Sequence, residues 1–169
     1  MTQKKQTRKM TKKHESGRSM IEMVGVLAVM GLITAAAFVL ITSAMRSQKL
    51  SRADDDVAAL AAGVRLLYNN TTSFTGIGSA NVLKVLGFDT VKAPYGNDTY
   101  TVGAAQQSTK GDRFYISFNA GDATTCAGLA GRTWGNGGAA KCNGTTLQIF
   151  FGRDGETVNK DSVTVVSGS

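Results

Sequence analysis

The chain has 169 residues and a formal net charge of +7, from 19 lysines and arginines against 12 aspartates and glutamates. That length allows one domain with a real core and leaves little room for a second. Six of the basic residues and one acid, Glu15, stand in residues 1–17, which leaves 13 basic and 11 acidic residues for the remainder. These are scattered, without a basic stripe interleaved with aromatics, so no specific nucleic-acid site is predicted.

The basic stretch is followed by an apolar run over residues 23–45, which contains no charge and no proline. As a helix it measures about 34 Å, enough for the roughly 30 Å of a bilayer's hydrocarbon. Because basic flanks stay in the cytosol, we expect the C-terminal part to be exported. A secretory signal peptide is a poor alternative, since the run is long and its only cleavage-like stretch, TAAAF, lies inside it. A plain signal anchor leaves Glu22 unexplained, because a carboxylate in hydrocarbon costs roughly 2.5–3.5 kcal/mol.

The stretch SG/RSMIEMVGVLAVMGL around Gly17 resembles the N-terminus of type IV prepilins. The shared pattern is a basic leader, a glycine, and an apolar helix with glutamate at the fifth position after that glycine. The resemblance implies that a prepilin peptidase cuts after Gly17, removes the leader 1–17, and methylates the new amine on Arg18. Glu22 matches the glutamate of the family. Arg18 is a departure, because the family usually has an apolar residue there.

The chemistry of Glu22 is consistent with a role in assembly. Cleavage creates an α-amino group, whose pKa is near 7.7–8, so it is largely a cation at neutral pH. Within a bundle of helices, this cation can pair with the carboxylate of a neighbouring subunit, and the penalty for missing the pair enforces register. An acid favoured by the helix macrodipole is the simpler explanation, but it accounts for neither the glycine nor the leader.

The helix is expected to continue beyond the membrane half, residues 18–45, into an amphipathic half, residues 46–69. This second half has a stripe at helical spacing, formed by Val57, Leu60, Ala61, Val64, Leu67 and Tyr68. A helix of about 50 residues is what the pilin resemblance implies. Three consecutive acids, residues 54–56, point in different directions on a helix, so a solvated face is predicted for them.

The remainder is divided into a Gly-, Thr- and Asn-rich αβ-loop region, 70–112, and a sheet with a disulfide-bounded region, 113–169. In the first, a short helix is predicted over 79–88 with Ser79 as N-cap, and a turn leading into a strand over 94–102. In the second, a helical turn is predicted to start at Asp122. Strands are predicted over 113–118, 146–151 and 161–166, the last two as an antiparallel hairpin around GRDGET.

Cys126 and Cys142 have no cysteine or histidine close by in the sequence, so the spacing of a zinc site is absent. In an exported domain they should form one disulfide, worth about 3 kcal/mol for such a loop. In a cytosolic domain they would be two buried thiols. The arrangement C…LA…WG…C around Trp134 resembles the C-terminal part of some type IVb pilins with conjugative and thin-pilus relatives. For Trp134 itself, core packing is expected.

The one histidine, His14, lies in the leader, so the mature chain would lack Ser–His and Cys–His nucleophile pairs. No enzyme activity, catalytic residue, cofactor or metal is therefore expected.

The resemblance implies an α+β fold of the type IV pilin kind, with a long N-terminal helix packed on an antiparallel sheet. It implies a structural subunit that polymerises with copies of itself through that helix, for adhesion, DNA transfer or motility. Its implied partners are the prepilin peptidase, the pilus assembly platform and a secretin. The subunit would lie in the inner membrane before assembly and in an extracellular pilus afterwards. The alternatives are a type II secretion pseudopilin or minor pilin, and a monomeric binding module on a signal anchor.

Overall fold

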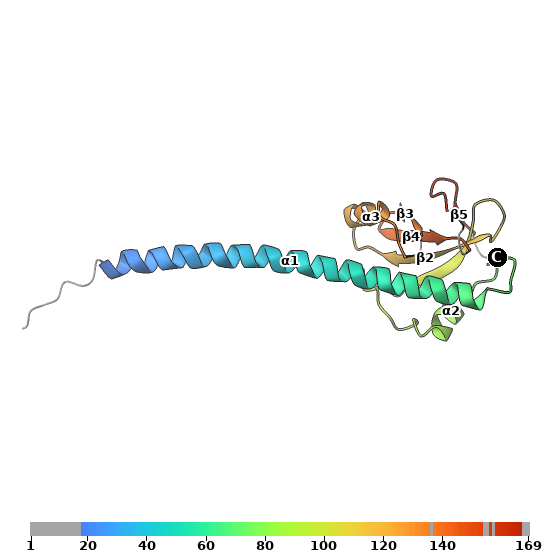
Figure 1. Cartoon of the computed structure of the whole chain (residues 1–169), viewed down its shortest axis with the longest axis horizontal. Coiled ribbons are helices and arrows are strands. Elements are labelled where there is room, and N and C mark those ends of the chain that lie inside the picture. Colours follow the sequence, from blue (N-terminus) through green and yellow to red (C-terminus); the bar gives the residue numbers. More distant parts are fainter. Residues whose placement is uncertain (1–17, 136, 154–155, 157, 167–169) are drawn as a thin grey trace, which may run out of the picture. The chain divides into compact units, whose positions relative to one another are not determined.

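The computed structural model describes residues 18–135, 137–153, 156 and 158–166, except for the side chains of residues 18 and 19. The chain divides into two compact units, Met1–Met45 and Arg46–Ser169. The described part of the first unit is the first half of helix α1 (Arg18–Leu67), which runs uninterrupted for 50 residues. The second unit contains the rest of α1 and every other described element (Figure 1). The long helix expected from the sequence is confirmed.

The second unit is a helix-on-sheet domain. The five strands are antiparallel and lie in the order β3-β4-β2-β1-β5. The elements besides α1 are α2 (Ser79–Val85), β1 (Thr101–Gln106), β2 (Arg113–Asn119), α3 (Ala123–Ala130), β3 (Ala139–Asn143), β4 (Thr146–Phe151) and β5 (Thr164–Val165). The α+β class and the strands predicted over 113–118 and 146–151 are confirmed. The sheet also takes in β1, which lies inside the range expected to be the αβ-loop region.

The core lies between the second half of α1 and one face of the sheet. Alternation along β2 and β4 directs large apolar side chains to this face, and the helical spacing of α1 supplies the opposing stripe. The fully buried members include Val57, Leu60, Val64, Phe114, Ile116, Leu147, Ile149 and Phe151. One member of the predicted stripe does not belong to it: Leu67 is 45% exposed, because it lies at the end of α1.

The opposite face of the sheet is partly covered by the C-terminal segment. Ala105, Phe150 and Val163 form a second buried cluster there. β5 pairs with β1, with Val165 opposite Ala105. This pairing brings Val163 into the same cluster as Phe150 of β4. Both faces of the sheet therefore carry buried apolar side chains, the face toward α1 over most of its area and the opposite face in part.

The predicted hairpin between residues 146–151 and 161–166 is wrong. Both edges of β4 are occupied, by β2 and by β3, so β5 pairs with β1 instead. The strand β3 was not predicted, although glycine at the first of two central residues, here Gly144-Thr145, is a signal for a tight hairpin turn. Gly144 has φ +61°, a conformation that glycine adopts at little cost.

The helix α2 is confirmed, but Ser79 is not its N-cap. Gly78 occupies that position and offers no side chain, while the Ser79 hydroxyl accepts a hydrogen bond from the Val102 amide at 3.0 Å. Ser79 therefore ties α2 to β1. The start of α3 follows the prediction, since the Asp122 carboxylate accepts from the Thr125 amide at 2.8 Å. The amide and the hydroxyl of Thr125 both donate to Asp122, and these two bonds hold the pKa of Asp122 below its usual value.

Candidate assembly surface

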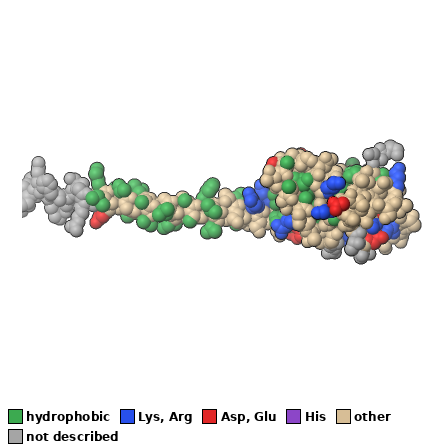
Figure 2. All heavy atoms as spheres, turned by 90° about the horizontal axis from the view of Figure 1, so that it is seen from above, with side chains coloured by type: hydrophobic (Ala, Val, Ile, Leu, Met, Phe, Trp, Pro, Cys, Tyr) green, Lys and Arg blue, Asp and Glu red, His purple; other side chains and the backbone are tan. Residues whose placement is uncertain are grey.

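The first unit exposes nearly all of its apolar surface. Its large apolar side chains between Met20 and Met45 are 55% to 79% exposed (Figure 2). This is the one helix, among the described residues, that is long and apolar enough to cross a membrane. A soluble monomer rarely exposes so large a contiguous apolar patch. A helix that is apolar on all sides is stable when lipid or other helices surround it.

Glu22 is the one charged residue between Met20 and Met45, and its side chain is exposed. No ion pair between described side chains includes it. Gly25 and Gly31 follow on the same helix, and a Cβ added at either would meet nothing within 4 Å. Because glycine has no side chain, a second helix can approach the backbone closely at these two positions. The apolar half of α1 thus combines one carboxylate with a surface suited to helix–helix packing.

The disulfide anchors α3 to the edge strand β3. Cys126 and Cys142 are bonded, with 5.9 Å between their Cα atoms, as expected for an exported domain. Within the enclosed loop, Trp134 is 1% exposed, donates from Nε1 to the Leu129 carbonyl at 3.0 Å, and packs edge-on against Phe118. The core role predicted for Trp134 is confirmed. The disulfide-bounded region is therefore a packed part of the domain.

The acids at residues 54–56 do not form the solvated face that was predicted. Asp54 accepts from the Gly135 amide at 2.9 Å, and Asp56 accepts from the Tyr100 hydroxyl at 2.9 Å. Burial and the bond to Asp56 raise the pKa of Tyr100. Only Asp55 is exposed. Two of the acids thus attach α1 to the domain, because the loop after α3 and Tyr100, just before β1, lie beside this turn of the helix.

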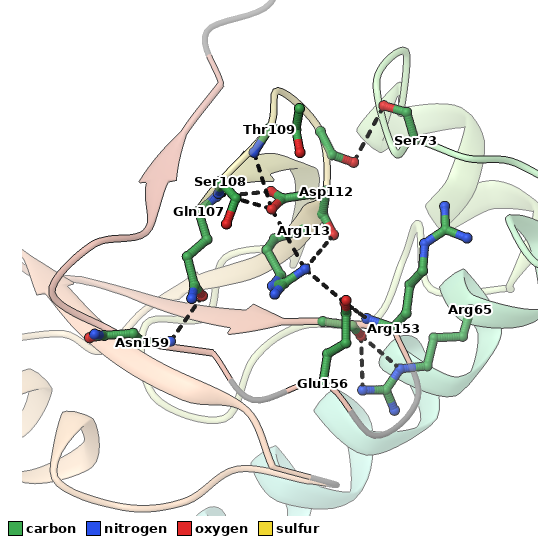
Figure 3. Close-up of polar contacts among 12 residues, drawn as sticks. Arg65, Ser73, Gln107, Ser108, Thr109, Asp112, Arg113, Arg153, Glu156 and Asn159 are labelled. Carbon is green, nitrogen blue, oxygen red and sulfur yellow. Dashed lines mark hydrogen bonds and ion pairs between the residues drawn. The ribbon is translucent and has the colours of Figure 1, made fainter.

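A cluster of polar side chains lies where β2 begins, and it was not predicted from the sequence (Figure 3). Arg113 is 8% exposed and donates to Glu156 at 2.7 Å. Asp112 accepts from the amides of residues 107–109 at 2.8 to 3.3 Å. Burial alone would raise the pKa of Asp112, but these donors and the charge of Arg113 together lower it.

The same cluster extends to the end of α1. Arg65 donates from two nitrogens to the Gly152 carbonyl, each at 3.2 Å, and Arg153 donates to the Thr71 carbonyl. These bonds join segments about 80 residues apart in the sequence, so no local pattern could reveal them. The role of these contacts is structural, because the bonded nitrogens of Arg65, Arg113 and Arg153 reach carbonyls or carboxylates of the chain itself.

Among the predicted site residues whose side chains the structure describes, the two cysteines are in contact. Gly17 lies outside the described residues, and Arg18 is the first residue of α1. Glu22 lies one turn further along that helix. In the part of the chain that the structure describes, no group of three or more histidine, cysteine, aspartate or glutamate side chains is placed to hold a metal ion.

A long helix with an exposed apolar first half, followed by a helix-on-sheet domain with a disulfide, defines the pilin class of fold. No family model matches the sequence. The chain is 30% identical over 147 residues to the protein named major structural subunit of bundle-forming pilus in Escherichia coli O127:H6, covering 82% of this chain and 74% of that protein. The protein of the same name in Escherichia coli O111:H- matches equally well. The chain belongs to the type IV pilin family, in its type IVb branch. It is a structural subunit and not an enzyme.

Proposed function

We propose that the chain is processed and polymerised as its family pattern implies. A prepilin peptidase cuts after Gly17 and methylates the amine of Arg18. The subunit then lies in the inner membrane until it is assembled. An assembly platform passes it into a filament that leaves through a secretin. The observation that carries the proposal is the exposed apolar half of α1, with a single carboxylate, Glu22, at the fifth position after the glycine.

The filament is held together in its core by the first halves of α1. The apolar side chains replace lipid contacts with contacts to neighbouring helices, and Glu22 pairs with the Arg18 amine of the next subunit. A charge pair that is desolvated in this way penalises a wrong register, because breaking it leaves an unpaired charge at a cost of about 3–5 kcal/mol. The carboxylate thus fixes the axial shift between neighbours.

Of the three uses considered, adhesion, DNA transfer and motility, we propose adhesion. The relatives are named for a pilus that forms bundles. Bundling requires lateral contact between filaments, and lateral contact between filaments of different cells is adhesion. Deleting the gene should abolish the formation of cell clumps, which can be measured by how fast the cells settle. Normal clumping without the protein would count against adhesion.

Intact mass of subunits from sheared filaments tests the processing step. The expected mature chain begins at Arg18 and carries one methyl group, and Gly17→Glu should leave only the longer precursor in the membrane fraction. A mature chain that starts after Met30 would instead show an ordinary signal peptide. Wild-type cells without any filament would favour the signal-anchored monomer, and a short periplasmic rod would favour the pseudopilin.

A further inference from the structure

The outward face of α1 in the second unit carries a regular stripe. Its positions alternate by four and three residues, and every one of them is exposed: Gln48, Arg52, Asp55, Ala59, Ala62 and Leu66. This spacing is that of a seam between packed helices. Leu66 is 78% exposed, although Val64 two positions earlier is fully buried on the other face. The stripe therefore lies opposite the core and ends in a large, exposed apolar side chain.

We propose that this stripe, residues 48–66, binds a second copy of the chain, shifted by four residues along the helix. The inference rests on the proposed function, in which Glu22 of one subunit meets the Arg18 amine of its neighbour. If the two helices are parallel, residue 18 of one subunit lies level with Glu22 of the other. Every later residue of the first subunit then lies level with the residue four positions further along in the second. The shift is about 6 Å, or one helical turn.

The shift matches opposite charges along the stripe. Arg52 of one subunit becomes level with residue 56 of its neighbour and adjacent to the neighbour's Asp55. Asp56 already accepts the Tyr100 hydroxyl, whereas Asp55 is exposed, so Asp55 is the expected partner. Without a shift, Arg52 would face Arg52, and like charges would repel. The residues of the stripe thus favour the same register that Glu22 sets.

The shift also matches side-chain size. Ala62 of one subunit becomes level with Leu66 of its neighbour, so a large side chain packs over a small one. The spacing of four and three continues towards the N-terminus at Met45, Ile41 and Phe38, which are exposed in the apolar half. The stripe is therefore continuous in sequence with the assembly surface. A contact of this kind joins two different positions of identical chains, and its repetition generates a helical filament.

Charge reversal in two separate chains tests the pairing. Arg52→Asp or Asp55→Arg alone should lower the mass of sheared filaments by roughly fivefold or more, because an attraction becomes a repulsion at every subunit contact. Co-expression of the two variants should restore most of the yield, since mixed neighbours regain opposite charges. Each variant chain carries like charges within its own helix, so contacts inside one subunit cannot explain the rescue. Lys84→Asp, an exposed reversal on α2, is the control and should leave the yield unchanged.

An exchange of size tests the packing independently. Ala62→Leu should lower the yield because it sets leucine against Leu66, and Ala62→Leu with Leu66→Ala should restore it. Both positions are exposed, so the membrane-fraction level and the disulfide should stay as in the wild type.

The outcomes separate this inference from the proposed function. A wild type without filaments overturns both. If Glu22→Ala cells form normal filaments, Glu22 does not set a shift of four residues, and the inference is overturned. If Glu22→Ala abolishes filaments while Arg52→Asp, Asp55→Arg and Ala62→Leu leave them at wild-type yield, only the stripe contact is wrong. Failure of co-expression to rescue the two charge variants also overturns it.

Discussion

The two halves of α1 have the same secondary structure but opposite surroundings. In the first unit, the large apolar side chains of the helix are more than half exposed. In the second unit, the helix contributes one stripe to a core closed by five strands and a disulfide. The second unit is stabilised by contacts within the chain, whereas the first requires lipid or other subunits. Mutations should therefore affect folding in one unit and assembly in the other.

Truncation of a phenylalanine should have different effects in the two units. Phe114→Ala should lower the free energy of unfolding of the second unit by about 3–5 kcal/mol, because Phe114 is fully buried between Phe74 and Phe151. Phe38→Ala should leave it unchanged, because Phe38 is 68% exposed in the other unit. Denaturant unfolding of the full chain in detergent, followed by the fluorescence of Trp134, measures both. An equal loss from the two substitutions would show that the units do not fold independently.

Removal of the disulfide should have the next largest effect. Cys126→Ala with Cys142→Ala should cost about 3 kcal/mol, since the bond closes a loop with a sequence separation of 16. The same unfolding measurement applies, with wild type under reducing conditions as the control. Reduction should destabilise the wild type and leave the variant unaffected. If oxidised wild type and variant were equally stable, the region around Trp134 would be held by packing alone.

The Asp112 carboxylate should make the second unit sensitive to acid. Its pKa is lowered in the folded chain, so its contribution is present above the ordinary value of about 3.8 and is lost as the pH falls through the folded value. Asp112→Asn should cost about 1–2 kcal/mol at pH 7, because three amide donors lose a charged acceptor. The difference should shrink below about pH 4.

Unfolding at a series of pH values, with the exposed Asp89→Asn as control, measures this dependence. A constant difference between Asp112→Asn and wild type from pH 7 to pH 3 would contradict it.

Two glycines should respond with opposite signs. Gly144→Ala should cost about 1 kcal/mol, because the turn between β3 and β4 requires φ +61°. Gly128→Ala should stabilise by about 0.5–1 kcal/mol, because it lies in α3 with nothing within 4 Å of an added Cβ. Melting temperatures of the two variants suffice. Equal shifts would show that the turn conformation does not hold the edge strand.

The sequence predicted the elements well where a pattern is local. Four features depend on neighbouring residues alone: the length and charge boundary of α1, the cap at Asp122, and the strands that end at Asn119 and at Phe151. Strand pairing was predicted wrongly, because the short segment Ala139–Asn143 mixes small and polar residues and does not alternate clearly. The turn that follows it, Gly144-Thr145, has glycine at its first central position, which indicates a hairpin.

The polar contacts of the second unit could not be predicted in this way. The local pattern around Asp54 and Asp56 predicts exposure to solvent, and the local pattern around Ser79 predicts a helix cap. Their actual partners lie 81, 44 and 23 residues away in the sequence. Such contacts depend on the tertiary arrangement, and one sequence does not encode them in a readable pattern.

The central claim is that the first unit is stabilised by other copies of the chain, and Glu22→Ala tests it most directly. The measurement is electron microscopy of sheared surface material, together with a membrane-fraction immunoblot and thiol labelling of unreduced protein. The substitution leaves the neighbour's amine without its charge partner, at a cost of about 3–5 kcal/mol per contact. Filaments should therefore be absent. The subunit should stay in the membrane at wild-type level, with Cys126 and Cys142 bonded, because the second unit is unchanged. Filaments of normal number and length from Glu22→Ala cells would contradict the claim.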